Sequence, residues 1–465
     1  MNHFLKEDLT NLEGLLSKIK EQGIAYLDNI SERATYSEHQ LPQEILSTKE
    51  GKGSRESLKI FNERLEPLVV ASSGPRYWGF VTGGTTPASI MGDWLTSIYD
   101  QNTQALTGVG DISGQIEIET IKMLLDFFEL PQDYIGGFVS GATMSNFTCL
   151  AVARQWIGKN LGQDFAKDGI TEKINVLSAM PHSSSIKSLS MLGIGSNNII
   201  KIKVAEGNRE CLDTVDFEEK IKELNGEPFI LISSAGTVNT VDFDDFQAIS
   251  KLKNKYNFWW HIDAAFGAFA KFSDEHKHLL KDWENADSIT IDNHKWMNVP
   301  YENAAFFIKE KHKLEQIETF QNSSAPYLGD PMEKFSYLNF LPENSRRLKA
   351  LPVWFSLIAY GKDGFKEMIE KSISLSQYFG NLIESDNNFE ILAPVRLNTV
   401  CFTLKNQSSE QVSEFLERLN QTKKVFLTPT IYNGKQAIRA AFVNWRTESS
   451  DVELVFNLMQ ELLRK

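Results

Sequence analysis

The chain has 465 residues, of which 42% are hydrophobic and 23% charged, and its formal net charge at pH 7 is −13. This length allows more than one domain, because single cores stop growing near ~250–300 residues. The acidic balance disfavours a nucleic-acid partner, since neutralising phosphates requires a basic face. No stretch approaches the ~18 apolar residues of a membrane span. We therefore expect a globular protein that binds neither nucleic acid nor membrane.

In chain order, three parts are predicted. Residues 1–70 form a helical segment that begins with an amphipathic helix. Residues 71–345 alternate short apolar runs with amphipathic stretches, which predicts a large domain with a mostly parallel sheet covered by helices. Residues 346–465 predict a small α+β domain with a long helix at 346–386, two strands and a terminal helix from Ser450. The strands expected in the large domain lie at 135–140, 174–180, 198–204, 229–236, 258–266, 288–292 and 304–309.

The cysteines and the N-terminal residues indicate the cellular compartment of the protein. Cys149, Cys211 and Cys401 are far apart and form no CxxC pair, which favours a reducing cytosol over a disulfide framework. The first 20 residues mix acidic side chains into an amphipathic pattern, unlike the basic start and apolar core of a signal peptide. We expect a cytoplasmic protein.

A lysine and an aspartate at the ends of two apolar runs are the most informative residues. Asp263 follows the apolar run FWW, and Lys295 lies in the sequence NHKW. A lysine amine can condense with the aldehyde of pyridoxal phosphate, whose ring nitrogen needs an acidic partner to remain protonated. Taken singly, such residues are more often structural, as a loop cap, a buried ion pair or a solvated lysine.

Two turns before helices offer further contacts. Residues 141–146, with the sequence GATMSN, follow a predicted strand, so their backbone N–H groups can hold a phosphate at a helix N-terminus. As an isolated pattern this is weak, since such a turn more often only caps a helix. His182 opens a polar turn, where capping and a functional role are about equally expected.

These motifs occur together in an order that resembles the group II pyridoxal-phosphate-dependent amino-acid decarboxylases. The matching stretches include GGFVSGATMSNFTCLAVAR (136–154), PHSSSIKSLSMLGIG (181–195), HIDAAFGA (261–268) and ADSITIDNHKWMNVP (286–300). The resemblance runs from about residue 60 to the end. It implies the aspartate aminotransferase-like fold of fold type I pyridoxal-phosphate-dependent transferases, with a seven-stranded sheet in the large domain.

The resemblance also implies a role for each matching residue. Lys295 carries pyridoxal 5'-phosphate as a Schiff base, and Asp263 binds the ring nitrogen. His182 stacks on the ring and helps to place the substrate carboxylate, Ala265 packs on the opposite face, and Thr237 lies near the ring hydroxyl. Ala142, Thr143 and Met144 contact the phosphate, and His294 has one nitrogen toward the phosphate or the substrate carboxylate.

The implied reaction converts an L-amino acid to its amine and carbon dioxide. The substrate amine displaces Lys295 to form an external aldimine, and loss of the carboxylate held perpendicular to the ring leaves a quinonoid. In the family, a tyrosine on a mobile loop before a Ser-Arg-Arg motif protonates that carbanion. Tyr337 is the expected acid, and Tyr327 is the alternative.

The substrate pocket is expected to include Phe80, Val81 and Thr82, together with Gln101 and Asn102 from a partner subunit. The pocket leaves open whether the substrate is aromatic, acidic or of another kind. No metal site is expected. The resemblance implies a homodimer with shared active sites, in which the N-terminal segment packs on the partner.

Several alternatives stay open. An aldehyde synthase or a carbon–carbon lyase on the same fold would share Asp263 and Lys295. A catalytically inactive interaction protein is disfavoured because every cofactor position is filled. A dinucleotide-binding oxidoreductase would need a GxGxxG motif, which the strand–turn–helix junctions lack.

Overall fold

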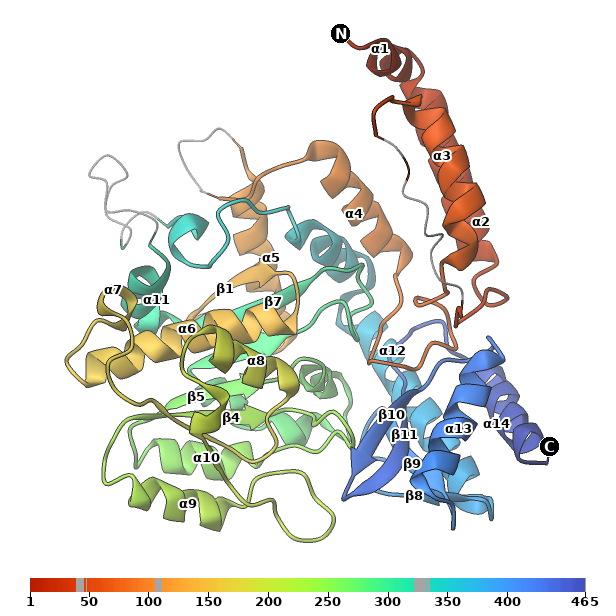
Figure 1. The fold of residues 1–465 in the computed structure, drawn as a ribbon. Coiled ribbons are helices and arrows are strands. Elements are labelled where there is room, and N and C mark those ends of the chain that lie inside the picture. Colours follow the sequence, from red (N-terminus) through yellow and green to blue (C-terminus); the bar gives the residue numbers. More distant parts are fainter. Residues whose placement is uncertain (39–45, 47, 105–110, 322–331, 333–334, 465) are drawn as a thin grey trace.

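The computed structural model describes residues 1–38, 46, 48–104, 111–321, 332 and 335–464 (Figure 1). At its centre is a seven-stranded sheet in the order β1-β7-β6-β5-β4-β2-β3. Only β7 runs antiparallel to its neighbours in this sheet. The sequence prediction of all seven strands is confirmed: β1 (Tyr134–Val139), β2 (Asn175–Ser178), β3 (Ile199–Lys201), β4 (Phe229–Ser234), β5 (Trp259–Asp263), β6 (Ser288–Ile291) and β7 (Ala304–Lys309).

Burial on both faces explains why these strands are continuous apolar runs. Along β4, Phe229 and Leu231 belong to the core on one face of the sheet, whereas Ile230 and Ile232 belong to the core on the other. A strand covered on both sides needs apolar side chains at odd and even positions alike.

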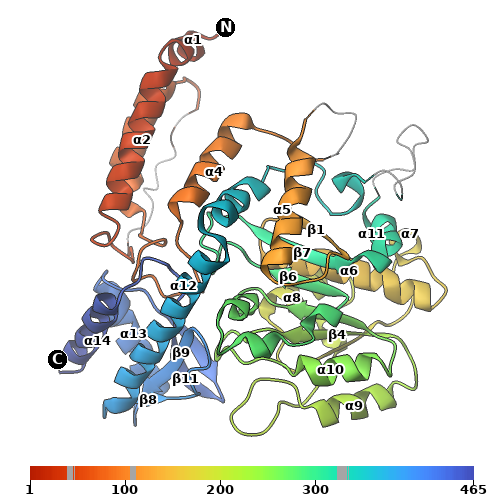
Figure 2. The ribbon, with the colours of Figure 1, turned by 180° about the vertical axis from the view of Figure 1, so that it is seen from behind.

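Helices supply both of these cores. One face is covered by α6 (Ala142–Asn160) and α8 (Ser183–Met191), with α7 (Phe165–Asp168) and α11 (Lys313–Phe320) packed against α6. The opposite core contains side chains from α5 (Ser113–Phe127), α9 (Thr214–Glu223), α10 (Phe246–Lys253) and α12 (Ala350–Ser385). Figure 2 shows α5 and α12 on the side of the molecule that is hidden in Figure 1.

A second sheet follows α12. It has four antiparallel strands in the order β10-β11-β9-β8. The predicted long helix is interrupted at Gly361, which has φ 55° inside α12, a conformation that glycine adopts readily. The elements of this part are β8 (Phe389–Ile391), β9 (Thr399–Leu404), α13 (Ser409–Gln421), β10 (Thr428–Tyr432), β11 (Lys435–Ala441) and α14 (Ser449–Arg464).

The N-terminal helices stand apart from the sheets as an arm (Figure 1). They are α1 (His3–Thr10), α2 (Leu12–Asp28) and α3 (Gly53–Arg64), and none of their residues is buried. The next helix, α4 (Pro87–Tyr99), packs on α12. In the part of the chain that the structure describes, no helix is long and apolar enough to cross a membrane.

Candidate active site

The residues expected to bind the cofactor gather at one edge of the large sheet. Asp263 ends β5, and the turn that contains Lys295 follows β6. His182 is the N-cap of α8, and Thr237 follows β4. Ligands of open parallel sheets bind beyond the carboxyl ends of the strands. Seven predicted residues line one cavity of about 520 Å³ here: Phe80, Val81, His182, Thr237, Asp263, Ala265 and Lys295.

Lys295 has a buried carboxylate beside it. Its Nζ lies 3.3 Å from Asp292 Oδ2, and His294 Nε2 lies 3.0 Å from Asp292 Oδ1. Burial opposes ionisation of Asp292, but the neighbouring Lys295 and His294 outweigh it and lower the pKa of this carboxyl. The backbone N–H of Asn303 donates to His294 Nδ1 at 3.2 Å, so the ring proton sits on Nε2. The sequence motif did not indicate this role of Asp292.

Segments distant in sequence hold the lysine turn. A Cβ atom on Gly83 would lie 1.9 Å from the carbonyl oxygen of Lys295, so only glycine fits there. Asn298 Oδ1 accepts a hydrogen bond from the Trp445 N–H at 3.2 Å. Its Nδ2 donates to the Val443 carbonyl at 3.0 Å. The position of Lys295 therefore depends on chain that precedes the large sheet and on chain that follows the small one.

Asp263 accepts hydrogen bonds on both oxygens. Oδ2 accepts from Asn146 Nδ2 at 2.9 Å and from Ser185 Oγ at 3.4 Å. Oδ1 accepts from the Ala265 N–H at 3.2 Å. Donors of this kind stabilise an ionised carboxylate. The arrangement suits a partner for a protonated ring nitrogen.

Thr237 hydrogen-bonds a buried carboxylate, that of Glu210, which the sequence analysis did not predict. Its Oγ1 donates to Glu210 Oε2 at 2.5 Å and accepts from the Asp242 N–H at 3.0 Å. Glu210 also accepts from Thr240 Oγ1 at 2.7 Å, and its side chain lines the cavity. Because Glu210 lies in a polar loop stretch, no pattern distinguished it. Thr237 has only one lone pair left to offer a ligand.

Arg439 places a cation in the cavity wall. Its Nη1 donates to the Val238 carbonyl at 3.1 Å, whereas its buried Nε has no hydrogen-bond partner among the described residues. Burial lowers the pKa of this guanidinium. A guanidinium in the wall of a cavity suits an anionic ligand. An arginine inside the apolar strand AIRAAFV was the available sequence signal.

The predicted side-chain pocket is only partly assembled around this cavity. Phe80 and Val81 both have left-handed backbone conformations, with φ 56° and 57°, of a kind that clusters at functional sites. Phe80 is 61% exposed, and its ring centroid lies 5.6 Å from that of Phe426. Thr82 is buried outside the cavity lining and hydrogen-bonds Tyr301.

Gln101 and Asn102 bond to their own chain. Gln101 Nε2 donates to the Tyr99 carbonyl at 2.7 Å, and Asn102 Oδ1 accepts from the Arg346 N–H at 2.8 Å. Neither lines the cavity of this chain. Their contribution to a partner's site stays a prediction, and residues 105–109 lie outside the described residues.

The start of α6 offers a site for a phosphate. Ala142, Thr143 and Met144 form its first turn, where backbone N–H groups have no partner within the helix. A Cβ atom on Gly141 would lie 3.3 Å from His294 Cε1, so bare backbone faces that imidazole. The positive end of a helix beside a histidine suits a phosphate.

The placement of Tyr337 as a loop acid is wrong. Its side chain is fully buried in the core beneath β1, and its hydroxyl donates to the Gly136 carbonyl at 3.3 Å. Burial raises the pKa of this phenol, which makes it a poorer acid. The alternative, Tyr327, lies outside the described residues.

We expect Tyr337→Phe to lower the free energy of unfolding by about 1 kcal/mol, because it removes one buried hydrogen bond and keeps the ring. Chemical denaturation measures this change. The organic product should stay the same as in the wild type. A change of product in this variant would show that Tyr337 is the proton donor after all.

The fold and the cavity define a pyridoxal-phosphate-dependent enzyme of fold type I. Residues 48–405 match the family described as the pyridoxal-dependent decarboxylase conserved domain, and the chain belongs to this family. It is a pyridoxal-phosphate-dependent amino-acid decarboxylase.

Relatives cover most of the chain. An aromatic-L-amino-acid decarboxylase from Bacillus atrophaeus is 28% identical over 414 residues, which span 86% of this chain and 84% of the relative. Phenylacetaldehyde synthase from Petunia hybrida is 24% identical over 87% of this chain and 83% of its own. The solved structure of Catharanthus roseus tryptophan decarboxylase with L-tryptophan superposes with a TM-score of 0.87 at 21% identity, covering 98% of both chains.

Proposed function

We propose that the protein decarboxylates an aromatic L-amino acid and that Lys295, Asp263, His182 and Arg439 carry the reaction. The observation that supports this most is one cavity lined by a lysine amine, a hydrogen-bonded carboxylate, a histidine and an arginine.

Each group has a role toward the cofactor. Lys295 would hold pyridoxal phosphate covalently, and Asp263 would hold the ring nitrogen in its protonated form. When bound, the cofactor draws electrons from the bond that breaks at the substrate's α-carbon. The phosphate would bind at the first turn of α6 and at His294, and the ring would lie between His182 and Ala265, with Thr237 at its hydroxyl.

Arg439 and His182 would orient the substrate. A guanidinium binds a carboxylate strongly, and a neutral imidazole can donate one further hydrogen bond. Together they would hold the substrate carboxylate out of the ring plane, the orientation in which its bond to the α-carbon breaks most readily. Arg439 is included in this proposal because it lines the cavity.

An aromatic substrate is supported by the apolar side of the cavity. Phe80 and Val81 line it, and Phe80 continues into an aromatic cluster with Phe426 and Tyr77. The names of several relatives specify aromatic amino acids. Aromatic surfaces attract an aromatic ring through burial and edge-to-face contact.

Amine formation from a panel of L-amino acids, followed by mass spectrometry, tests this proposal. Tyrosine, tryptophan or phenylalanine should give its amine, and glutamate and aspartate should give none. Preference for an acidic substrate would overturn the aromatic assignment. An aldehyde and peroxide as the main products would favour the second candidate, an aldehyde synthase such as those among the relatives.

Tyr327 is the proposed acid that protonates the α-carbon after carbon dioxide leaves. We expect Tyr327→Phe to keep the rate of carbon dioxide release within about tenfold and to shift the organic product from amine toward aldehyde, ammonia and peroxide, because without a proton donor the α-carbon would be open to oxidation by dioxygen. Product analysis measures the shift, and Tyr337→Phe is the matched control. An unchanged amine yield would exclude Tyr327 as the donor.

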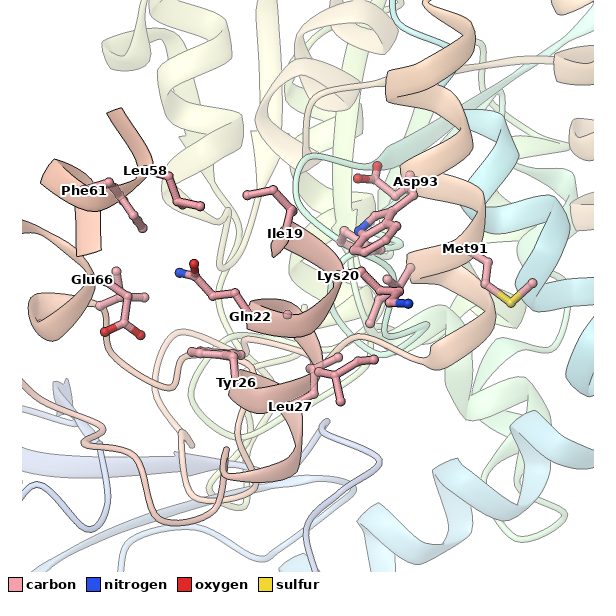
Figure 3. A pocket seen from close by; sticks show the side chains of 16 residues that line it. Ile19, Lys20, Gln22, Tyr26, Leu27, Leu58, Phe61, Glu66, Met91 and Asp93 are labelled. Carbon is pink, nitrogen blue, oxygen red and sulfur yellow. The ribbon is translucent and has the colours of Figure 1, made fainter. Parts of the chain in front are cut away.

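A homodimer is proposed from the apolar surface of the N-terminal arm. An apolar groove of about 790 Å³ lies between α2, α3 and α4, and Figure 3 shows side chains from all three helices around it. Within one chain the arm buries none of its residues, although isolated helices of this length are marginal in water. A second copy of the chain would cover the exposed apolar side chains of this region: Leu16, Ile19, Ile24, Phe61, Met91 and Trp94.

We expect Met91→Glu to weaken the dimer by about 2 kcal/mol or more, because a charge would enter an apolar interface. Met91 is 59% exposed in the single chain. Sedimentation velocity over a range of concentrations measures the change. The control is Val215→Glu, at an equally apolar and 68% exposed position on α9. Equal behaviour of the two variants would place the interface elsewhere.

A cytoplasmic location is proposed from the cysteines. Cys149, Cys211 and Cys401 are all free thiols and all buried. Such thiols persist in a reducing compartment. Fractionation of the source cells would test the location directly.

A further inference from the structure

Beneath the proposed cofactor site, a chain of buried side chains links Asp263 to His182. It begins at Trp259, whose Nε1 donates to Ser288 Oγ at 2.9 Å. Ser288 Oγ is also 2.9 Å from His261 Nδ1, and His261 Nε2 is 2.8 Å from Asn146 Oδ1. The Asn146 side chain is fully buried.

From Asn146 the chain divides. Its Nδ2 donates to Asp263 Oδ2 at 2.9 Å and to Ser184 Oγ at 3.1 Å. Ser184 Oγ in turn lies 2.7 Å from His182 Nδ1. One amide group therefore contacts the carboxylate expected at the ring nitrogen and, through one hydroxyl, the histidine expected on the ring face.

The direction of every hydrogen bond can be assigned. An ionised Asp263 only accepts, so the amide nitrogen of Asn146 faces it and Asn146 Oδ1 faces His261. His261 therefore carries its proton on Nε2 and donates to Asn146 Oδ1. Burial lowers the pKa of His261 to about 4, which agrees with a neutral ring whose Nδ1 accepts from Ser288 Oγ. An indole N–H only donates, so Ser288 in turn accepts from Trp259.

A separate hydrogen bond fixes which nitrogen of His182 carries the proton. The backbone N–H of Ser184 donates to His182 Nδ1 at 3.2 Å, so Nδ1 carries no proton. Ser184 Oγ accepts from Asn146 and donates to that same nitrogen. His182 is left with its proton on Nε2, the nitrogen not engaged within this network.

We infer that Asn146 is a positioning residue that orients the Asp263 carboxylate for the cofactor ring nitrogen and, through Ser184, fixes His182 as the tautomer with its proton on Nε2. This inference rests on the proposed function. Asn146 touches neither substrate nor cofactor in it and acts through Asp263 and His182.

The test compares two cofactors that differ at one atom: pyridoxal phosphate and its 1-deaza analogue, in which carbon replaces the ring nitrogen. Asn146→Ala should weaken binding of pyridoxal phosphate about ten- to a hundredfold, the effect of losing a hydrogen bond to a charged group. It should weaken binding of the deaza analogue far less, because that ring makes no ion pair with Asp263. Ser145→Ala, which removes a buried hydroxyl from the next position of the same helix, should leave both affinities unchanged.

Equal loss of both affinities in Asn146→Ala, or loss of neither, would overturn the inference. If that variant does not fold, His261→Phe replaces it, since it removes the donor that orients the amide and keeps Asn146 in place. The same discrimination between cofactors is expected. Failure of wild-type protein to bind pyridoxal phosphate on Lys295 would instead reject the proposed function.

A second readout follows His182. In apoprotein with ¹⁵N-labelled histidine, Nδ1 of His182 should resonate as an unprotonated ring nitrogen in the wild type and in Ser145→Ala. Ser184→Ala should shift this signal toward a mixture of tautomers and leave the discrimination between the two cofactors intact. An unchanged His182 signal in Ser184→Ala would contradict the branch to His182.

Discussion

Lys295→Ala should abolish covalent attachment of pyridoxal phosphate and lower turnover on the order of a thousandfold or more, because it removes the group that holds the aldehyde and exchanges with the substrate amine. Borohydride treatment of the wild type should fix the cofactor on the peptide that contains Lys295, and the variant should show no fixed cofactor. Peptide mass spectrometry and visible absorbance measure both effects.

Lys253→Ala is the matched control, because it removes another partly buried lysine that pairs with an aspartate away from the cavity. It should retain the visible absorbance and the labelled peptide. Label on any other lysine in the wild type would reject the site assignment. Loss of turnover in Lys295→Ala with the cofactor still fixed would do the same.

Asp263→Ala should lower turnover on the order of a thousandfold or more, because an unprotonated ring nitrogen is a poor electron sink. It should also weaken cofactor binding, since the donors from Asn146 and Ser185 would then face the ring without a carboxylate between them. Equilibrium dialysis and single-turnover kinetics separate the two effects.

Asp216→Ala removes an aspartate that is also buried but pairs with Lys203, and neither residue lines the cavity. We expect it to change stability and leave cofactor affinity and turnover within about twofold, the usual limit for a site without shared contacts. If Asp263→Ala bound the cofactor and turned over like Asp216→Ala, the ring-nitrogen role would be wrong.

The sequence predicts the large sheet well for a physical reason. Strands such as β4 and β5 are buried on both faces, so their apolar runs are strong and end abruptly where polar site residues begin. Asp263 ends β5 and Lys295 lies in the turn after β6, so the local pattern and the family resemblance both predicted these two residues as site residues. The long helix predicted over 346–386 begins at Ala350 instead and is interrupted at Gly361, where the backbone is left-handed.

Residues that reach the site from elsewhere in the fold were not predictable in this way. Glu210 lies in a polar loop and Arg439 in an apolar strand of the second sheet, and only the tertiary arrangement places both in the cavity wall. Tyr337 precedes the Ser-Arg-Arg motif as expected, but local sequence does not show that its ring packs inward under Gly136. Register within a loop is set by contacts that the linear pattern does not record.

The contacts of the lysine turn with Val443 and Trp445 bear on how the protein is made. Because Asn298 bonds to both, and Arg439 comes from the same stretch, a nascent chain lacks a finished site until residues 439–445 have been synthesised. Acquisition of cofactor then marks synthesis and folding of this stretch. Chains that end before residue 439 should accumulate as apoprotein even where pyridoxal phosphate is plentiful, so visible absorbance measures how much of the chain population has folded through residue 445 during expression.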